Sequence, residues 1–420
     1  MTEAQGVPPS SARAQVAGPS YTGPGALRSR LDRLLSRAHG TRVVIGQSVG
    51  GLPIEAYEWT LGGRLTGRAA PVVRAGPVGG EGSAGRQEPD APERPAGRER
   101  PDARERPASR RDPGARQAPA GRADPDAREG AMVRSDSSGG LLLISLLHPM
   151  EWIGLETHLA LLEHWLLSSR MDGEEWPVEA PAIPAGTRIR SIPVANPDGF
   201  RRVDEARRRL RPRWVRGNLH GVDLNRNFPV NWRPRPGWLR FWPLYRPGPH
   251  ALSEPETAAV AAYARREMTS CSISLHSFGR WLFYPPSTGS VTPLRRTEAH
   301  ASAALRLAPP GYRTAPLARW ASWFRAHGTE IDTLEALTGS PAYLLEIGRS
   351  SFGRWGRGSG AGPRPPFLDP FTLFNPPDPA AVAGELVAFL TDLARRALED
   401  EVAPDEAAAG ERPARRLSDP

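Results

Sequence analysis

The sequence is 420 residues long, is 39% apolar and carries a formal net charge of +9, which is enough chain for one large core or two small ones. It contains no lysine, so all 55 basic residues are arginine, which excludes a lysine Schiff base and a phosphate loop that ends in lysine. The single cysteine, Cys271, excludes an internal disulfide framework and a multi-cysteine zinc cluster. Arginine in a chain rich in Ala, Gly and Pro favours coding bias over an anionic partner, so nucleic-acid binding is not expected.

The first residues, MTEAQGVPPSSARAQ, contain no apolar signal region. No window approaches the roughly 20 consecutive apolar residues that a membrane span requires. We therefore expect no membrane contact and a cytoplasmic location.

Residues 66–140 contain no Leu, no Ile and no aromatic residue, and mix Arg, Pro, Ala and Asp. Such a segment buries too little apolar surface to offset its ordering entropy, so we predict disorder for 66–138 and likewise for 1–25 and 401–420. The insert is either a tolerated surface insertion or a tether that binds a partner. Strand-like patterns on both sides predict that the insert interrupts one domain, formed by residues 26–65 and 139–400.

Strands and helices alternate along the rest of the chain. Strands are predicted at 42–49, 53–59, 141–147, 188–196, 270–276 and 341–348. A helix follows the third strand, with an apolar stripe at spacings of three and four that leaves His158 and His164 on the solvated surface. A capping box of Ser253 and Glu256 predicts a second helix through Met268, and a third covers about 380–398. The pattern favours an α/β fold with a mixed, mostly parallel central sheet and helices on both faces.

Metal-binding side chains follow the predicted strands. His148 ends the run SLLHPMEW with Glu151 three residues later, and His276 ends another strand. Ligands gather at the carboxyl ends of strands in such folds, and two His with one Glu is an established ligand set for catalytic zinc. The H-x-x-E spacing alone is weak, and a structural role for His148 remains open at this stage.

Two further features carry polar groups. Glu346 lies inside the apolar run AYLLEIG, where an unpaired carboxylate costs several kcal/mol, so it requires an arginine partner or a catalytic role. The segment RGNLHGVDLNRNFP, residues 216–229, concentrates Arg, Asn and Asp on one loop without helical or strand periodicity. Dense polar groups on a loop beside an apolar sheet are typical of recognition.

These motifs, in this order, resemble the zinc carboxypeptidases of the M14 type. The resemblance covers roughly residues 42–398 apart from the insert, and rests on HPME, NPDGF, R-x-N-x-x-G-V-D-L-N-R-N-F, SEPET, SLHSFG and GTEID…LLEIG. It implies a hydrolase that removes the C-terminal amino acid of a peptide with a free carboxylate. It implies one zinc ion per chain on His148, Glu151 and His276.

The resemblance also implies the other roles. Glu346 would be the general base and acid, and Arg216 would stabilise the oxyanion. Asp223 would accept a hydrogen bond from a zinc histidine, most simply His148. Substrate-binding roles fall on Asn225 and Arg226, which would hold the terminal carboxylate, and on Ser277, Phe324 and Ile331.

The sequence departs from the family pattern at several positions. Pro149 and Met150 stand where many relatives have Gly and Arg, which removes a charged contact to the substrate. Phe324 falls where many members carry a capping tyrosine, and a phenyl ring donates no hydrogen bond. Ile331 falls where relatives read the terminal side chain, and an apolar group there disfavours a basic residue.

Two other functions remain open from the sequence. One is a related amidase that acts on cell-wall peptides of the murein tripeptide type, and the other is a catalytically inactive peptide-binding relative. Residues 231–247 interleave Arg and Trp, as on some single-stranded nucleic-acid surfaces, but such text is more typical of a loop at the rim of a cleft.

Overall fold

The computed structural model describes residues 21–62, 140–167, 181–211, 213–235, 245–289, 294–320, 325–349 and 370–402. They form an eight-stranded sheet in the order β1-β2-β4-β3-β5-β8-β6-β7. The central neighbours β4, β3, β5 and β8 run parallel, and antiparallel partners flank them on both sides. The strands are β1 Thr41–Gln47, β2 Pro53–Thr60, β3 Gly140–Ser145, β4 Arg188–Ile192, β5 Cys271–His276, β6 Trp281–Tyr284, β7 Arg313–Pro316 and β8 Ala342–Glu346. The predicted α/β class with a mixed sheet is confirmed.

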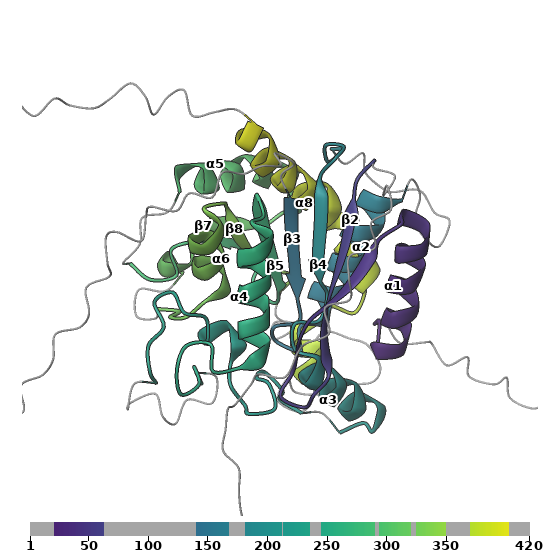
Figure 1. Cartoon of the computed structure of the whole chain (residues 1–420), viewed down its shortest axis with the longest axis vertical. Coiled ribbons are helices and arrows are strands. Elements are labelled where there is room, and N and C mark those ends of the chain that lie inside the picture. Colours follow the sequence, from purple (N-terminus) through teal and green to yellow (C-terminus); the bar gives the residue numbers. More distant parts are fainter. Residues whose placement is uncertain are drawn as a thin grey trace, which may run out of the picture. The chain divides into compact units, whose positions relative to one another are not determined.

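Helices cover both faces of this sheet (Figure 1). The strand β3 shows why, because its side chains alternate between two apolar clusters. Leu141 and Leu143 pack into the cluster that includes α2 and α8, whereas Leu142 and Ile144 pack into the cluster that includes α4 and α6. A strand buried on both faces is continuously apolar, as the sequence predicted. The helices are α1 Pro24–Ala38, α2 Trp152–Leu166, α3 Pro197–Arg208, α4 Pro255–Glu267, α5 Arg295–Ala304, α6 Glu330–Thr338, α7 Pro370–Phe374 and α8 Pro379–Val402.

The folded unit begins earlier than the sequence predicted. Residues 21–25 were expected to be disordered, yet α1 begins at Pro24, where proline suits the first turn of a helix. Tyr21 is 9% exposed and donates its hydroxyl to the carbonyl of Pro376 at 2.6 Å. Thr22 donates its hydroxyl to Glu156 on α2 at 3.0 Å. Two side chains therefore order a segment whose composition gave no sign of it.

Two local predictions on the helices are wrong. Helix α4 begins at Pro255 with Glu254 as its cap, and the Ser253 hydroxyl donates to Glu254 at 2.7 Å, so no Ser253–Glu256 capping box forms. His158 is fully buried instead of solvated. It lies between Ser145 of β3 and Ser191 of β4, at 2.9 and 2.7 Å from their hydroxyls, and burial lowers its pKa to about 3.

In the part of the chain that the structure describes, no helix is long and apolar enough to cross a membrane. The predicted insert, residues 66–138, lies outside the described residues, as does most of the predicted C-terminal tail.

Candidate metal centre and active site

The first two candidate ligands follow the end of β3. Glu151 directly precedes α2, and its backbone N–H donates to the carbonyl of His148 at 3.1 Å, which closes a tight turn. Asn375 fixes this turn from outside, because its amide donates to the Met150 carbonyl at 2.8 Å and accepts from the Ile153 N–H at 2.9 Å. His276 is the last residue of β5, which is the parallel neighbour of β3. The carboxyl ends of parallel strands meet at one edge of the sheet, so these side chains converge.

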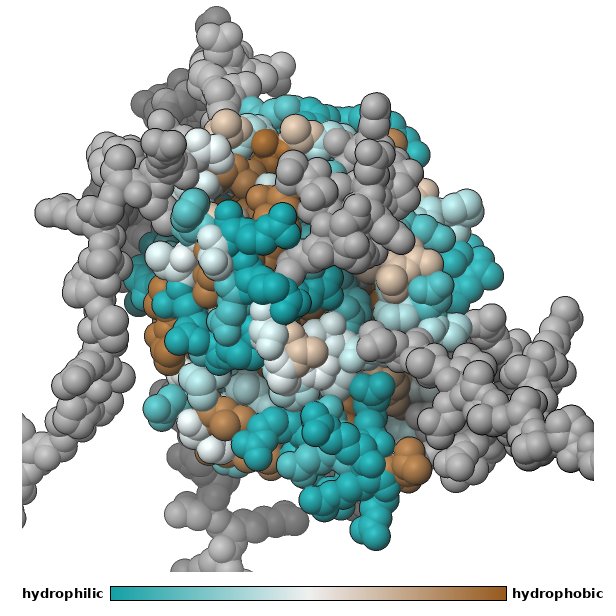
Figure 2. All heavy atoms as spheres, turned by 90° about the vertical axis from the view of Figure 1, so that its right-hand side faces the viewer, coloured by the Kyte–Doolittle hydropathy of each residue, from teal (hydrophilic) through white to brown (hydrophobic). Residues whose placement is uncertain are grey.

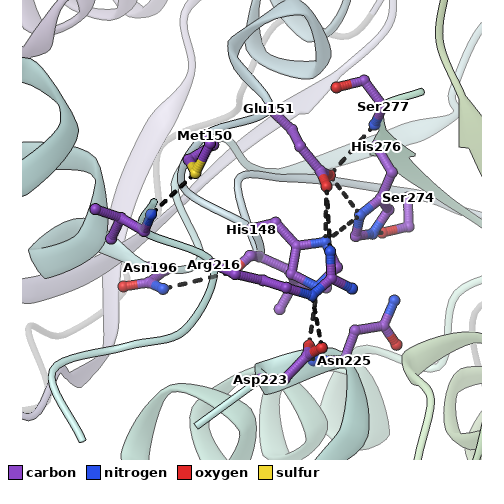
Figure 3. Close-up of polar contacts among 12 residues, drawn as sticks. His148, Met150, Glu151, Asn196, Arg216, Asp223, Asn225, Ser274, His276 and Ser277 are labelled. Carbon is purple, nitrogen blue, oxygen red and sulfur yellow. Dashed lines mark hydrogen bonds and ion pairs between the residues drawn. The ribbon is translucent and has the colours of Figure 1, made fainter. Parts of the chain in front are cut away.

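The three side chains point toward one another (Figure 3). His148 Nδ1 lies 3.0 Å from Glu151 Oε1, His276 Nδ1 lies 2.9 Å from Glu151 Oε2, and the two Nδ1 atoms are 3.1 Å apart. Ligand atoms about 2.0 Å from a tetrahedral zinc ion lie about 3.3 Å from one another. The observed separations are close to that value, and all three residues are buried. The donor set therefore fits a single zinc ion.

The opposite nitrogen of each histidine ring faces a carboxylate. His148 Nε2 lies 2.9 Å from Asp223 Oδ1, so the contact predicted from the resemblance is present. His276 Nε2 lies 3.0 Å from Glu330 Oε1 and 3.1 Å from the Ser274 hydroxyl. An ionised carboxylate can only accept a hydrogen bond, so Nε2 of each ring carries the proton. Each Nδ1 then keeps the lone pair that a metal requires. Glu330 was not among the residues predicted from the sequence.

Glu346 lies beside this group because of strand register. It is the last residue of β8, and β5 and β8 pair in parallel with His276 opposite Glu346. Burial, followed by the negative charge of Glu151, raises the pKa of Glu346 to about 7. Its Oε2 atom is buried and has no hydrogen-bond partner among the described residues. Glu346 is thus a carboxyl group poised to exchange a proton near neutral pH.

Arg216 is held at the same site by Asp223. Its Nε donates to Asp223 Oδ2 at 2.8 Å, and its Nη1 lies 3.8 Å from Glu151 Oε1 (Figure 3). Burial alone would lower the pKa of Arg216, but Asp223 and Glu151 outweigh it and raise that pKa. Burial likewise acts to raise the pKa of Asp223, and Arg216 and His148 outweigh it, so this pKa falls well below its usual range. Asp223 therefore fixes a permanent cation and a metal histidine together.

Three of the predicted substrate-binding residues, Asn225, Arg226 and Ser277, lie near this centre. Asn225 is buried, and its side-chain carbonyl accepts from the Glu330 N–H at 3.1 Å. The next residue, Arg226, donates its Nη1 to the backbone carbonyl of Asn225 at 2.5 Å, and burial lowers the pKa of Arg226. Ser277 donates its N–H to Glu151 Oε2 at 3.2 Å, while its hydroxyl has no partner among the described residues.

The other two predicted substrate-binding residues, Phe324 and Ile331, make no contact with the candidate ligands that the described residues show. Phe324 lies outside the described residues. Ile331 is fully buried in the apolar cluster that includes α4 and α6. Met150 is also buried, and its sulfur accepts from the Val215 N–H at 2.9 Å. It supports the loop that carries Arg216.

Fold and site together define a class: an α/β protein with a candidate metal centre at the carboxyl ends of its parallel strands. The chain belongs to the zinc carboxypeptidase family of peptidases, M14, whose model matches residues 130–343. The matched region contains the three candidate ligands and Arg216, and it ends just before Glu346.

Individual relatives agree with this assignment. Bovine carboxypeptidase O is 32% identical over 99 residues, which are 22% of this chain and 26% of that protein. Mouse mast cell carboxypeptidase A is 36% identical over 100 residues, 22% of this chain and 24% of that protein. The chain thus matches about a quarter of the length of these relatives. In fold, it resembles carboxypeptidase A from Helicoverpa armigera with a TM-score of 0.56 at 18% identity, over 90% of this chain and 74% of that one. Bovine thrombin-activatable fibrinolysis inhibitor, solved with a tick carboxypeptidase inhibitor, gives a TM-score of 0.54 at 15% identity, over 91% of this chain and 98% of that one.

Proposed function

We propose that this protein is a zinc-dependent carboxypeptidase that hydrolyses the last peptide bond of a substrate with a free C-terminal carboxylate. One zinc ion per chain would be held by His148, Glu151 and His276. The observation that carries the proposal is Glu346, a carboxyl group of raised pKa with an uncommitted oxygen, placed opposite a candidate ligand by strand register. A structural carboxylate at that position would be paired.

The roles of the side chains follow from their chemistry. Zinc in this site would supply a Lewis acid that polarises the scissile carbonyl and lowers the pKa of water toward about 7. Glu346 accepts a proton from the attacking water and donates it to the leaving amine. Arg216, which Asp223 holds as a fixed cation, donates hydrogen bonds to the oxygen on which negative charge develops.

Arg226 and Asn225 are proposed to read the chain terminus. A guanidinium matches a carboxylate with two parallel hydrogen bonds, and partial burial strengthens such a contact. Burial already disfavours the charged form of Arg226, so its pKa is lowered, and an incoming carboxylate would relieve that cost. The Ser277 hydroxyl is proposed to contact the substrate beside the metal. The cytoplasmic location, the place of Phe324 over the substrate and the preference set by Ile331 stay predictions from the sequence.

The experiment compares a peptide with a free C-terminus and the same peptide amidated there. The terminal contact is worth roughly 1.5 to 3 kcal/mol, so amidation is expected to slow cleavage at least about tenfold. Arg226→Ala is expected to slow cleavage of the free acid by a similar factor and to affect the amide much less, because mutation and amidation remove the same contact.

The matched control is Arg201→Ala, an arginine on α3 whose side chain is 60% exposed and which should behave like the wild type. Equal cleavage of both peptides, with Arg226→Ala harming both alike, would show that the enzyme does not read a terminus. Release of diaminopimelate from a murein tripeptide would instead assign the chain to the cell-wall amidases.

A further inference from the structure

Glu330 is a buried carboxylate in contact with the candidate metal centre. It is the first residue of α6, and its side chain is fully buried. Its backbone N–H donates to the Asn225 side-chain carbonyl at 3.1 Å, which ties α6 to the polar loop formed by residues 216–229. Its Oε1 lies 3.0 Å from His276 Nε2. Three segments of the chain, β5, the polar loop and α6, therefore meet at this one side chain.

Burial of a carboxylate costs free energy, so its presence at this position requires an explanation. A buried carboxylate loses its hydration, and only a charged or hydrogen-bonding partner compensates that loss. The only ion pair recorded for Glu330 among the described residues is with His276. Its second oxygen, Oε2, is buried without a hydrogen-bond partner in the same part of the chain. Fold stability alone does not account for an acid at this position.

The geometry mirrors that of Asp223 across the site. His148 directs Nδ1 to the shared centre and Nε2 to Asp223, at 2.9 Å. His276 directs Nδ1 to the same centre and Nε2 to Glu330, at 3.0 Å. The Ser274 hydroxyl, at 3.1 Å, is the other neighbour of that nitrogen, but a hydroxyl donates as readily as it accepts and does not fix a tautomer. Glu330 does, because an ionised carboxylate only accepts.

We propose that Glu330 is a positioning residue for the zinc site and acts through His276. It holds the ring in the Nε2–H tautomer, fixes its orientation and increases the electron density at Nδ1. The centre then has one carboxylate behind each histidine, on separate elements. The proposal rests on the metal centre described above and not on the choice of peptide substrate.

The test measures the affinity of the metal-free, full-length protein for Zn²⁺, without any substrate. The protein competes for the ion with a chromogenic chelator. Loss of an outer carboxylate typically costs 10- to 100-fold in metal affinity. Glu330→Gln is expected to weaken zinc binding by that factor, and Asp223→Asn by a comparable one. The cobalt-substituted variant should show a changed visible absorption spectrum, which reports ligand geometry independently of activity.

The matched control is Glu335→Gln, because Glu335 is a buried carboxylate on the same helix that accepts from Thr297 and touches neither histidine. Its zinc affinity should stay within about twofold of the wild type. Glu330→Gln with wild-type zinc affinity and cobalt spectrum would overturn the proposal. Failure of the wild type to bind zinc would overturn the metal centre itself, so the two failures are distinct.

A measurement on the wild type keeps the test independent of whether Glu330→Gln folds. In the zinc-loaded protein, proton–nitrogen NMR of the histidine rings should show a proton on Nε2 of His276 and none on Nδ1. A ring with Nε2 unprotonated would exclude the hydrogen bond to Glu330 and with it the proposed role.

Discussion

Glu346 lies next to the candidate ligands without being one of them, and that position separates proton transfer from metal binding. His148, Glu151 and His276 present their donor atoms to one another, whereas Glu346 Oε2 has no hydrogen-bond partner among the described residues. We therefore expect Glu346→Gln to retain zinc and to lose about 100-fold to 10,000-fold in turnover, because glutamine fills the same space but exchanges no proton. Metal content by mass spectrometry and single-turnover peptide cleavage measure the two effects.

His276→Ala is the contrasting variant at the same strand register. It removes a ligand, so it should lose most of its zinc together with its activity. If Glu346→Gln turned over peptides at a near-normal rate, the base would be another residue. Full zinc occupancy in His276→Ala would remove His276 from the metal site.

At the scale of elements, helix α6 carries a second buried acid that makes stability depend on pH. Glu335 accepts from the Thr297 hydroxyl of α5 at 3.1 Å, and burial raises its pKa to about 7. In the unfolded chain a glutamate titrates near pH 4.3, so the folded state binds the proton more tightly. The contribution of this proton binding to the free energy of unfolding is fully present below about pH 4.3 and is lost as pH rises through about 7.

Glu335→Gln should therefore be more stable than the wild type at pH 8 by about 3 to 4 kcal/mol, and similar to it near pH 4.5. Urea unfolding of the zinc-free protein across this range measures the difference. Glu385→Gln, at an exposed glutamate on α8, should show no such pH dependence relative to the wild type. A constant difference between Glu335→Gln and the wild type at all pH values would contradict a titrating, buried Glu335.

The elements also show which parts of the site were predictable from sequence. The apolar runs that became β3 and β5 end at or just before His148 and His276, and the rule that parallel strands share an edge brings those two residues together. Glu346 was expected inside its strand, whereas β8 ends at it. The sequence prediction of His158 was wrong because it assumed that α2 has one solvated face. Most residues of α2 are buried, since α8 and the sheet enclose it from two sides.

Glu330 was missed for a different reason. Its role depends on α6 beginning against the end of β5, and that contact joins segments 54 residues apart. No local pattern encodes it, because glutamate in the first turn of a helix is ordinarily favoured by the helix dipole alone. Tyr21 and Thr22 escaped prediction similarly, since each acts through a single distant contact. Periodicity finds elements, but it does not find side chains whose partners come from tertiary structure.

At the scale of the whole molecule, apolar side chains gather in the core, and the part of the surface drawn in Figure 2 is mainly hydrophilic. The face shown in Figure 2, on the α1 side, carries hydrophilic side chains interspersed with small apolar areas. The large apolar side chains that are exposed in the described residues come from separate segments, among them Val44, Leu210 and Met268. Most apolar material instead lies in the two clusters on either side of the sheet.

The register of the sheet predicts that the insert at 66–138 is dispensable. Thr60 of β2 and Gly140 of β3 both pair with Arg188 of β4, from opposite sides, so they lie two strand spacings apart, about 10 Å. A six-residue Gly/Ser linker spans that distance, and the shorter loop lowers the closure entropy by about 2 kcal/mol at most. Replacing 66–138 with this linker should keep zinc binding and small-peptide turnover near wild-type values and leave the thermal midpoint equal or slightly higher. Removing residues 1–22 instead should lower that midpoint, because Tyr21 and Thr22 contact the folded unit. Insoluble or zinc-free linker protein would show that the insert supports the domain.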